Sequence, residues 1–153
     1  MKIVALALAS LVALTTAVGC SSGPAGGDLK GTWSRNDPTS KFVSLETFYR
    51  FDSDAFSEMI LAKDAAGKQY VSCARGVWRS TGNEVEIQLK GKLGGLDQDS
   101  QYVVFKSTYD VDGDTMTFVT TEGSRTQTDS FARKLAPLEV EQFCKEEFAK
   151  LSK

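Results

Sequence analysis

The feature that most constrains the fold is a strict alternation of apolar and polar residues between Glu84 and Leu93. The odd-numbered positions hold Val85, Ile87 and Leu89, whereas the even-numbered positions between them hold acidic, amide and lysine side chains. Successive side chains of a β-strand point to opposite faces, so the alternation predicts a strand with one buried and one solvated face. An amphipathic helix would repeat its apolar residues every three or four positions instead.

Similar alternation recurs from Gly31 onward, with turn residues such as Asp112-Gly113 about every ten residues. The pattern predicts eight strands, at residues 31–36, 42–51, 55–63, 69–80, 84–93, 101–111, 115–121 and 125–135. Short connections favour pairing of consecutive strands, and closure removes the exposed edges. The predicted fold class is therefore all-β, an eight-stranded antiparallel up-and-down barrel. A two-sheet sandwich, which would need longer crossing connections, is the alternative.

One helix is predicted after the last strand, over residues 137–153. Pro137 suits the first helical turn, Glu139 and Glu141 lie near the positive end of the helix dipole, and Lys150 lies near the negative end. Apolar residues recur at helical spacing, at Val140, Cys144, Phe148 and Leu151. We expect this α-helix to pack outside the barrel through that stripe.

The first 19 residues read as a signal peptide that is separate from the folded body. Lys2 gives a short basic start, residues 3–18 are mainly apolar, and small Gly19 precedes Cys20. The apolar run is short for a membrane span, which needs about 20 residues.

The sequence Ala17-Val18-Gly19-Cys20 resembles the bacterial lipobox, in which the cysteine is acylated and becomes the first residue after cleavage. Acyl chains on Cys20 would hold the protein at a membrane, since each buried methylene contributes about 0.8 kcal/mol. Residues 20–28 are rich in Gly and Ser and predict a flexible linker. Ordinary signal cleavage, with Cys20 left as an unmodified thiol, is the alternative.

The expected location follows from that resemblance. Ser21, directly after the lipid-bearing cysteine, resembles the residues that sort lipoproteins to the outer membrane. We therefore expect a lipid-anchored protein of the cell envelope, at the outer membrane and facing the periplasm. In a host with one membrane, the expected location is its extracytoplasmic face.

Lipidation of Cys20 would leave an even pair of cysteines, Cys73 and Cys144. In an oxidising compartment such a pair favours a disulfide over a metal site or a catalytic nucleophile.

Composition excludes several functions. The chain has no histidine, which removes Ser-His triads and His-ligated metals, and its formal net charge of −2 argues against a nucleic-acid partner. Glu84 and Glu86 share a strand face that the alternation places in solvent. Residues 110–114 are rich in aspartate but lack the spacing of a calcium-binding EF-hand, and Asp-Gly is a strong hairpin signal. We therefore expect no enzyme activity, no resident metal and no cofactor.

Two short motifs carry a family resemblance. Residues 28–33 hold Gly31 and Trp33 separated by one residue at the first strand, and Phe131-Ala132-Arg133 lies in the last strand. Over residues 29–135 the chain resembles the lipocalin-like proteins, especially small bacterial lipoproteins of that group, and the barrel domain is expected to span residues 29–136. The resemblance implies that Arg133 packs over Trp33 to close the barrel, and that a disulfide joins a middle strand to the C-terminal segment. The alternative is a core Trp33 with a solvated Arg133.

Side-chain direction on the fourth strand suggests where a ligand could lie. If Cys73 points outward to the helix, residues of the other parity point inward, and three of these are small. An eight-stranded barrel is either filled by its side chains or holds one small ligand. The candidate ligand-binding residues are Tyr49, Tyr70, Trp78, Phe105 and Tyr109.

The sequence thus leads to two functional hypotheses. The first is a lipid-anchored lipocalin-like protein that binds a small hydrophobic or amphipathic ligand in its barrel. The second is an envelope protein with a packed barrel and no ligand, which binds another envelope protein as an inhibitor or assembly factor. Neither hypothesis involves nucleic acid.

Overall fold

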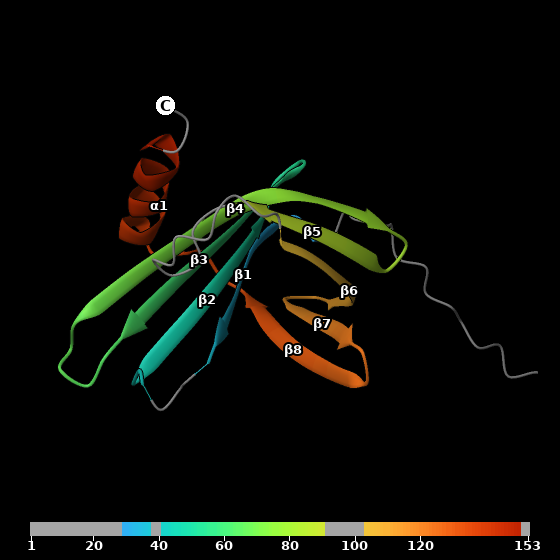
Figure 1. The fold of residues 1–153 in the computed structure, drawn as a ribbon, viewed down its shortest axis with the longest axis horizontal. Coiled ribbons are helices and arrows are strands. Elements are labelled where there is room, and N and C mark those ends of the chain that lie inside the picture. The colour runs from blue at the N-terminus through green and yellow to red at the C-terminus, as the bar shows by residue number, and fades with distance from the viewer. Residues whose placement is uncertain (1–28, 38–40, 91–102, 151–153) are drawn as a thin grey trace, which may run out of the picture.

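The computed structural model describes residues 29–37, 41–90 and 103–150. Within them the chain forms eight strands followed by one helix (Figure 1). The elements are β1 (Gly31–Asn36), β2 (Ser44–Phe51), β3 (Ala55–Lys63), β4 (Gln69–Thr81), β5 (Glu84–Lys90), β6 (Val103–Asp112), β7 (Thr115–Glu122), β8 (Arg125–Arg133) and α1 (Leu138–Lys150).

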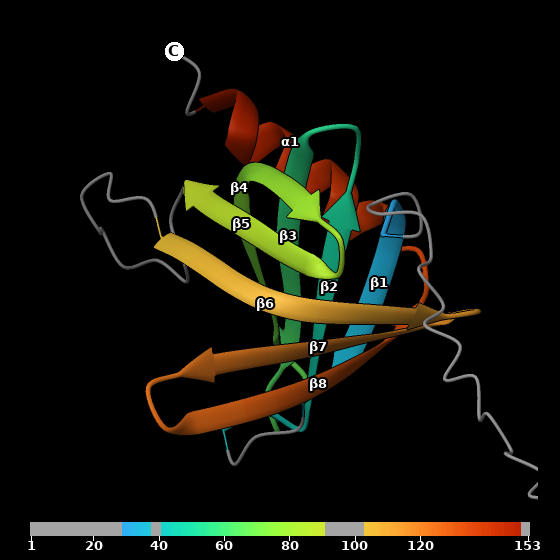
Figure 2. The same ribbon diagram turned by 90° about the vertical axis from the view of Figure 1, so that its right-hand side faces the viewer.

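The strands form a closed antiparallel barrel in sequence order, so the predicted up-and-down topology is confirmed and the sandwich is wrong. Strand β1 completes the closure by pairing with β8, with Trp33 opposite Arg133 and Ser34 opposite Ala132. Figure 2 shows β6, β7 and β8 crossing β1, β2 and β3 at a steep angle. The inner faces of the two halves therefore meet across the barrel.

The barrel interior is packed mainly by aromatic and aliphatic side chains. Leu29, Trp33, Phe51, Phe56, Val85, Ile87, Leu89, Met116, Phe118 and Phe131 form one buried cluster with Ala74. Several of these come from the alternating segment that predicted a one-sided strand. Leu93, the last apolar residue of that segment, lies outside the described residues.

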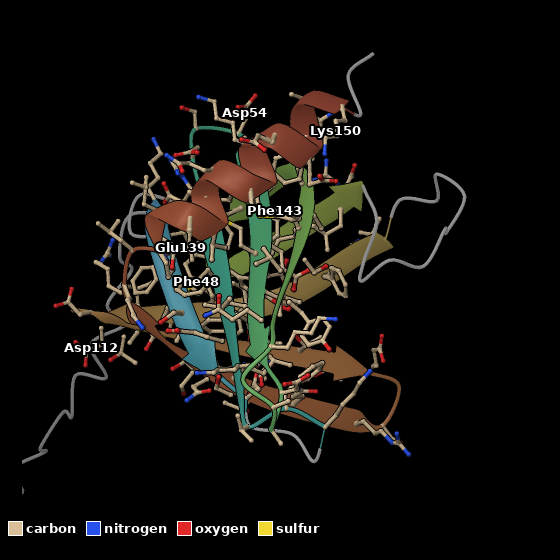
Figure 3. The ribbon with its side chains drawn as sticks, turned by 90° about the vertical axis from the view of Figure 1, so that its left-hand side faces the viewer. Phe48, Asp54, Asp112, Glu139, Phe143 and Lys150 are labelled. Atoms are coloured by element: carbon tan, nitrogen blue, oxygen red, sulfur yellow. A yellow bond between two sulfur atoms is a disulfide. The ribbon has the colours of Figure 1, made fainter. Side chains whose placement is uncertain are left out.

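Helix α1 packs on the outer face of the barrel against β3 and β4, as Figure 3 shows from the helix side. Val140 and Cys144 are its buried residues, and they join Phe48 and Met59 in a second apolar cluster. Cys73 on β4 forms a disulfide with Cys144, which confirms the predicted pairing. The last residue of the predicted helical stripe, Leu151, lies outside the described residues.

Candidate functional site

One group of residues closes the barrel, and we call Leu29, Gly31, Trp33 and Arg133 the closing contact. The Arg133 guanidinium lies over the buried Trp33 indole at 4.1 Å from the ring centroid. The Trp33 Nε1–H donates to the Leu29 carbonyl at 2.8 Å, and Arg133 Nη1 donates to the Lys30 carbonyl at 3.0 Å. The cation–π contact and the Arg133 hydrogen bond thus join the two ends of the sheet, and the Trp33 hydrogen bond fixes the chain that enters β1.

Gly31 is required at the closing contact for two reasons. Its φ of +124° lies in a region that residues with a Cβ rarely adopt. A Cβ added there would lie 2.8 Å from Arg133 Nη1. The spacing of Gly31 and Trp33 therefore serves the architecture, because the missing side chain lets the guanidinium approach the first strand.

Part of the interior is polar, and we call Arg35, Glu58 and Asp129, together with Tyr49, the polar cluster. The register pairs Glu58 with Tyr49 on one side and with Ala74 on the other, and both of these neighbours belong to the inner core. Asp129 is paired with Phe118 of the same core. Paired residues share a face, so both carboxylates are directed to the inside of the barrel.

Arg35 neutralises only part of this cluster. Its guanidinium forms ion pairs with Asp37 and Asp129 and lies over the Phe131 ring, 5.1 Å from the centroid. Three carboxylates thus lie close to one cation. Glu58 Oε2 is buried, and no hydrogen-bond partner for it exists among the described residues.

Burial raises the pKa values of Glu58 and Tyr49, which are hydrogen-bonded to each other. Burial raises the pKa of the Glu58 carboxyl above its usual value, although Arg35 and a hydrogen bond with Tyr49 act in the opposite direction. Burial also raises the pKa of the Tyr49 phenol, and the neighbouring Glu58 charge adds to the effect. Tyr49 therefore stays protonated and serves as a hydrogen-bond donor to Glu58.

A cavity of about 60 Å³ lies beside the polar cluster. Five aromatic rings line it, together with aliphatic, hydroxyl and carboxylate side chains: Tyr49, Phe56, Phe105, Phe118, Phe131, Ile87, Leu89, Ser107, Thr120 and Asp129. Pockets that enclose drug-sized ligands measure about 300–1,000 Å³. This cavity can therefore enclose a small chemical group, and a large apolar molecule does not fit inside it.

The structure places the five candidate ligand-binding residues in different surroundings. Tyr49 and Phe105 line the cavity together. Trp78 packs edge-on against Phe51 and donates through Nε1 to the Asp52 carbonyl. Tyr109 packs against the inner core, and its hydroxyl donates to the Gly82 carbonyl. Tyr70 is exposed and donates to Asp64 in the β3–β4 hairpin.

The small inward residues of β4 were expected to leave room for a ligand, but at Gly76 and Ala74 neighbouring groups take up that space. A Cβ added to Gly76 would lie 1.9 Å from the Gln88 carbonyl oxygen. Gly76 is therefore small because β5 passes very close to β4. Ala74 is buried in the inner core opposite Glu58, so its neighbours fill the space beside it.

Arg35, Glu58 and Asp129 were not among the residues that the sequence suggested. The available signal was parity, since Arg35 shares a face with Trp33, and Asp129 shares one with Phe131. Glu58 likewise shares its face with Phe56 on β3. A charged residue at a position that the alternation assigns to the interior points to a buried polar group.

Other features that the sequence raised are explained by the structure of the described residues. Glu86 points outward, where it pairs with Arg79 and Lys106, and a hydrogen bond from Gln88 is the main cause of its lowered pKa. No group of three or more Cys, Asp or Glu side chains in the described ranges is placed to hold a metal ion. Gly113, at φ +58°, forms the turn between β6 and β7. The described chain contains no helix that is long and apolar enough to span a bilayer.

Comparison with known proteins finds no matching family model, no matching curated protein and no matching solved structure. The class is therefore defined by the architecture alone. A closed eight-stranded antiparallel barrel with a C-terminal helix on its outer face is consistent with a lipocalin-like fold.

Proposed function

We propose that the protein is a lipid-anchored binding protein of the cell envelope, and that its lipocalin-like barrel recognises a small amphipathic ligand. The observation that carries this proposal is the cavity of about 60 Å³ with five aromatic rings and the Asp129 carboxylate in its wall. Aromatic rings supply apolar contact area, and a few polar groups orient the ligand. No catalytic step is proposed.

The size of the cavity favours an amphipathic ligand over a purely hydrophobic one. About 60 Å³ admits only a few non-hydrogen atoms, so a small head group enters while the rest of the ligand stays nearer the surface. Phe105 lines the cavity and is 39% exposed, so this wall of the cavity reaches the surface. The ligand's tail is expected to leave along that side.

The lipid anchor rests on the sequence, because residues 1–28 lie outside the described residues. Leu29 is fully buried in the inner core, so a tether from Cys20 joins the barrel at the closing contact. Changing Cys20 to Ala is expected to release the protein from the membrane fraction. Recovery of the Cys20→Ala variant in the membrane fraction, in the same amount as the unchanged protein, would refute the anchor.

Native mass spectrometry of the protein purified from its own host tests ligand binding. A reproducible extra mass is expected in the unchanged protein and in Phe143→Trp, but not in Phe105→Trp, whose larger ring fills the cavity. Phe143 is a matched control because it is 41% exposed, close to the 39% of Phe105, and lies on α1. An extra mass that survives Phe105→Trp would place the ligand elsewhere.

A second candidate function, binding of another envelope protein, is favoured by an apolar surface near α1. Leu135 is 78% exposed and Leu138 is 65% exposed. Leu138 also lines a groove of about 470 Å³ between α1 and the barrel, together with Met59, Phe148 and several polar or charged side chains. Chemical cross-linking in the host should capture one stoichiometric partner, and Leu138→Glu should remove it. Unchanged cross-linking of Leu138→Glu would reject this surface.

A further inference from the structure

The cavity and the polar cluster together indicate which kind of head group would fit. We infer that the cavity binds a small organic ammonium group, a protonated or methylated amine at the end of an amphipathic ligand. The inference rests on the proposed function, because it names the chemical class of ligand for the same cavity. Three features carry it: the charge balance, the aromatic wall and the cavity's size.

The charge balance of the cluster favours a cation. Asp37 and Asp129 share the Arg35 guanidinium, and Glu58 Oε2 has no hydrogen-bond partner in the described chain. A buried carboxylate oxygen without a partner is costly, since it has lost its water without gaining a replacement. An ammonium ion next to the cluster would supply the missing positive charge. An anionic head group would be repelled by Asp129, which lines the cavity.

The aromatic wall already holds one cation. The Arg35 guanidinium lies 5.1 Å from the centroid of Phe131, and the Tyr49 ring stacks on Phe131 at 4.8 Å. Cations are attracted to the faces of aromatic rings, and this attraction strengthens when water is excluded. Phe105 and Phe118 line the same cavity, so an ammonium group would enter among aromatic rings beside a carboxylate.

The size of the cavity limits the head group. A water molecule takes up about 30 Å³ in the liquid, so about 60 Å³ corresponds to roughly two waters. A primary or singly methylated ammonium group has this size. A neutral apolar group of the same size would fill the space but would leave the negative charge of the Asp129 carboxylate and its neighbours only partly balanced by Arg35.

Isothermal titration calorimetry with n-hexylammonium and 1-hexanol tests the inference, because the two probes differ mainly in the charge of the head group. The full mature protein is expected to bind n-hexylammonium at least tenfold more tightly than 1-hexanol at neutral pH. Equal affinities, or tighter binding of 1-hexanol, would overturn the ammonium assignment and leave the proposed function intact. Absence of binding by either probe would overturn both.

Matched variants locate the binding. Glu58→Gln removes the charge and keeps the shape of the side chain, so it should weaken n-hexylammonium binding at least tenfold. Glu84→Gln is the control, because Glu84 is exposed on the outer face. If Glu58→Gln does not fold, Asp129→Asn should weaken binding in the same direction. Unchanged n-hexylammonium affinity in a folded Glu58→Gln or Asp129→Asn variant would refute the site.

Discussion

Arg133 and Arg35 each lie over an aromatic ring, and their surroundings differ sharply. Arg133 lies 4.1 Å from the Trp33 ring centroid, and its ion-pair partner Asp114 has a side chain that is 87% exposed. Arg35 lies 5.1 Å from the Phe131 ring centroid, between the carboxylates of Asp37 and Asp129. A guanidinium thus lies over an aromatic ring near water at Arg133 and inside the barrel at Arg35.

The difference separates a structural contact from a binding site. At the closing contact, the Trp33 indole and the Arg133 guanidinium both donate to backbone carbonyls of the chain entering β1. In the polar cluster, Glu58 Oε2 has no hydrogen-bond partner among the described residues, and Asp129 of the same cluster lines a cavity. Buried polar groups in folded proteins are nearly always paired, so an unpaired one calls for a functional explanation.

Loss of the Trp33 ring should have the largest effect, because it breaks the closing contact. Trp33→Ala empties a fully buried site, and such truncations cost roughly 3–5 kcal/mol of unfolding free energy. Urea denaturation followed by circular dichroism measures this loss, and Phe143→Ala, at an exposed site on α1, is the control. A loss below about 1 kcal/mol would mean that closure does not depend on Trp33.

Removal of the disulfide should cause the second-largest loss of stability. It should leave the ring contacts of Arg35 and Arg133 unchanged. Cys73 and Cys144 are 71 residues apart, and a loop of this length corresponds to about 4 kcal/mol in the chain-entropy model. The Cys73→Ser/Cys144→Ser variant should therefore unfold at lower urea concentration. Its affinity for n-hexylammonium should stay unchanged, because the disulfide belongs to the outer cluster under α1. A parallel loss of affinity would show that the two clusters are coupled.

Neutralising Glu58 should change the unfolding free energy less than these two variants do, and it should stabilise the protein instead of destabilising it. The raised pKa of Glu58 means that the folded state binds its proton more tightly than the unfolded state does. The unchanged protein is therefore penalised at pH values above that pKa, and the penalty disappears as pH falls toward the ordinary glutamate range. At neutral pH, Glu58→Gln should therefore be more stable than the unchanged protein.

Urea denaturation at a series of pH values measures this dependence. The stability difference between Glu58→Gln and the unchanged protein should shrink as the pH is lowered. Glu84→Gln, at an exposed position on the outer face, should show no such trend. A difference that stays constant over the whole pH series would contradict a buried, charged Glu58.

Removing the Arg133 charge should have the smallest effect. Arg133→Met keeps much of the side chain's length and loses the cation–π contact, which is worth about 1 kcal/mol, together with the solvent-exposed hydrogen bond to the Lys30 carbonyl. Urea denaturation measures the change, and binding of n-hexylammonium should be unaffected. Weaker binding in Arg133→Met would remove the distinction between the closing contact and the polar cluster.

The sequence predicted the architecture well because alternation reports directly on one-sided burial. Val85, Ile87 and Leu89 are all buried in the inner core, as their parity predicts. The expected bridge to a helix outside the barrel required Cys73 to point outward, and its disulfide with Cys144 on α1 shows that it does. Short turns between strands were enough to indicate pairing of consecutive strands.

Parity could have pointed to Arg35 and Asp129, but it is a weak signal for Glu58 because β3 is buried on both faces. Met59 is covered by the outer cluster under α1, while Phe56 belongs to the inner core. Apolar residues therefore occur at both parities of β3, and Glu58 does not stand out as an inward charge. The cavity depends on packing across the barrel, and a list of side-chain sizes does not determine how closely strands approach, as Gly76 illustrates.

The most direct test of the division between closing contact and polar cluster is a titration with n-hexylammonium followed in ¹H–¹⁵N correlation spectra. We predict saturable shifts of the amides of Phe105, Ser107 and Thr120, whose side chains line the cavity. The Trp33 indole N–H, which is held by the Leu29 carbonyl, should not move. The absence of saturable shifts at the cavity, or an equally large shift of the Trp33 indole signal, would contradict the account.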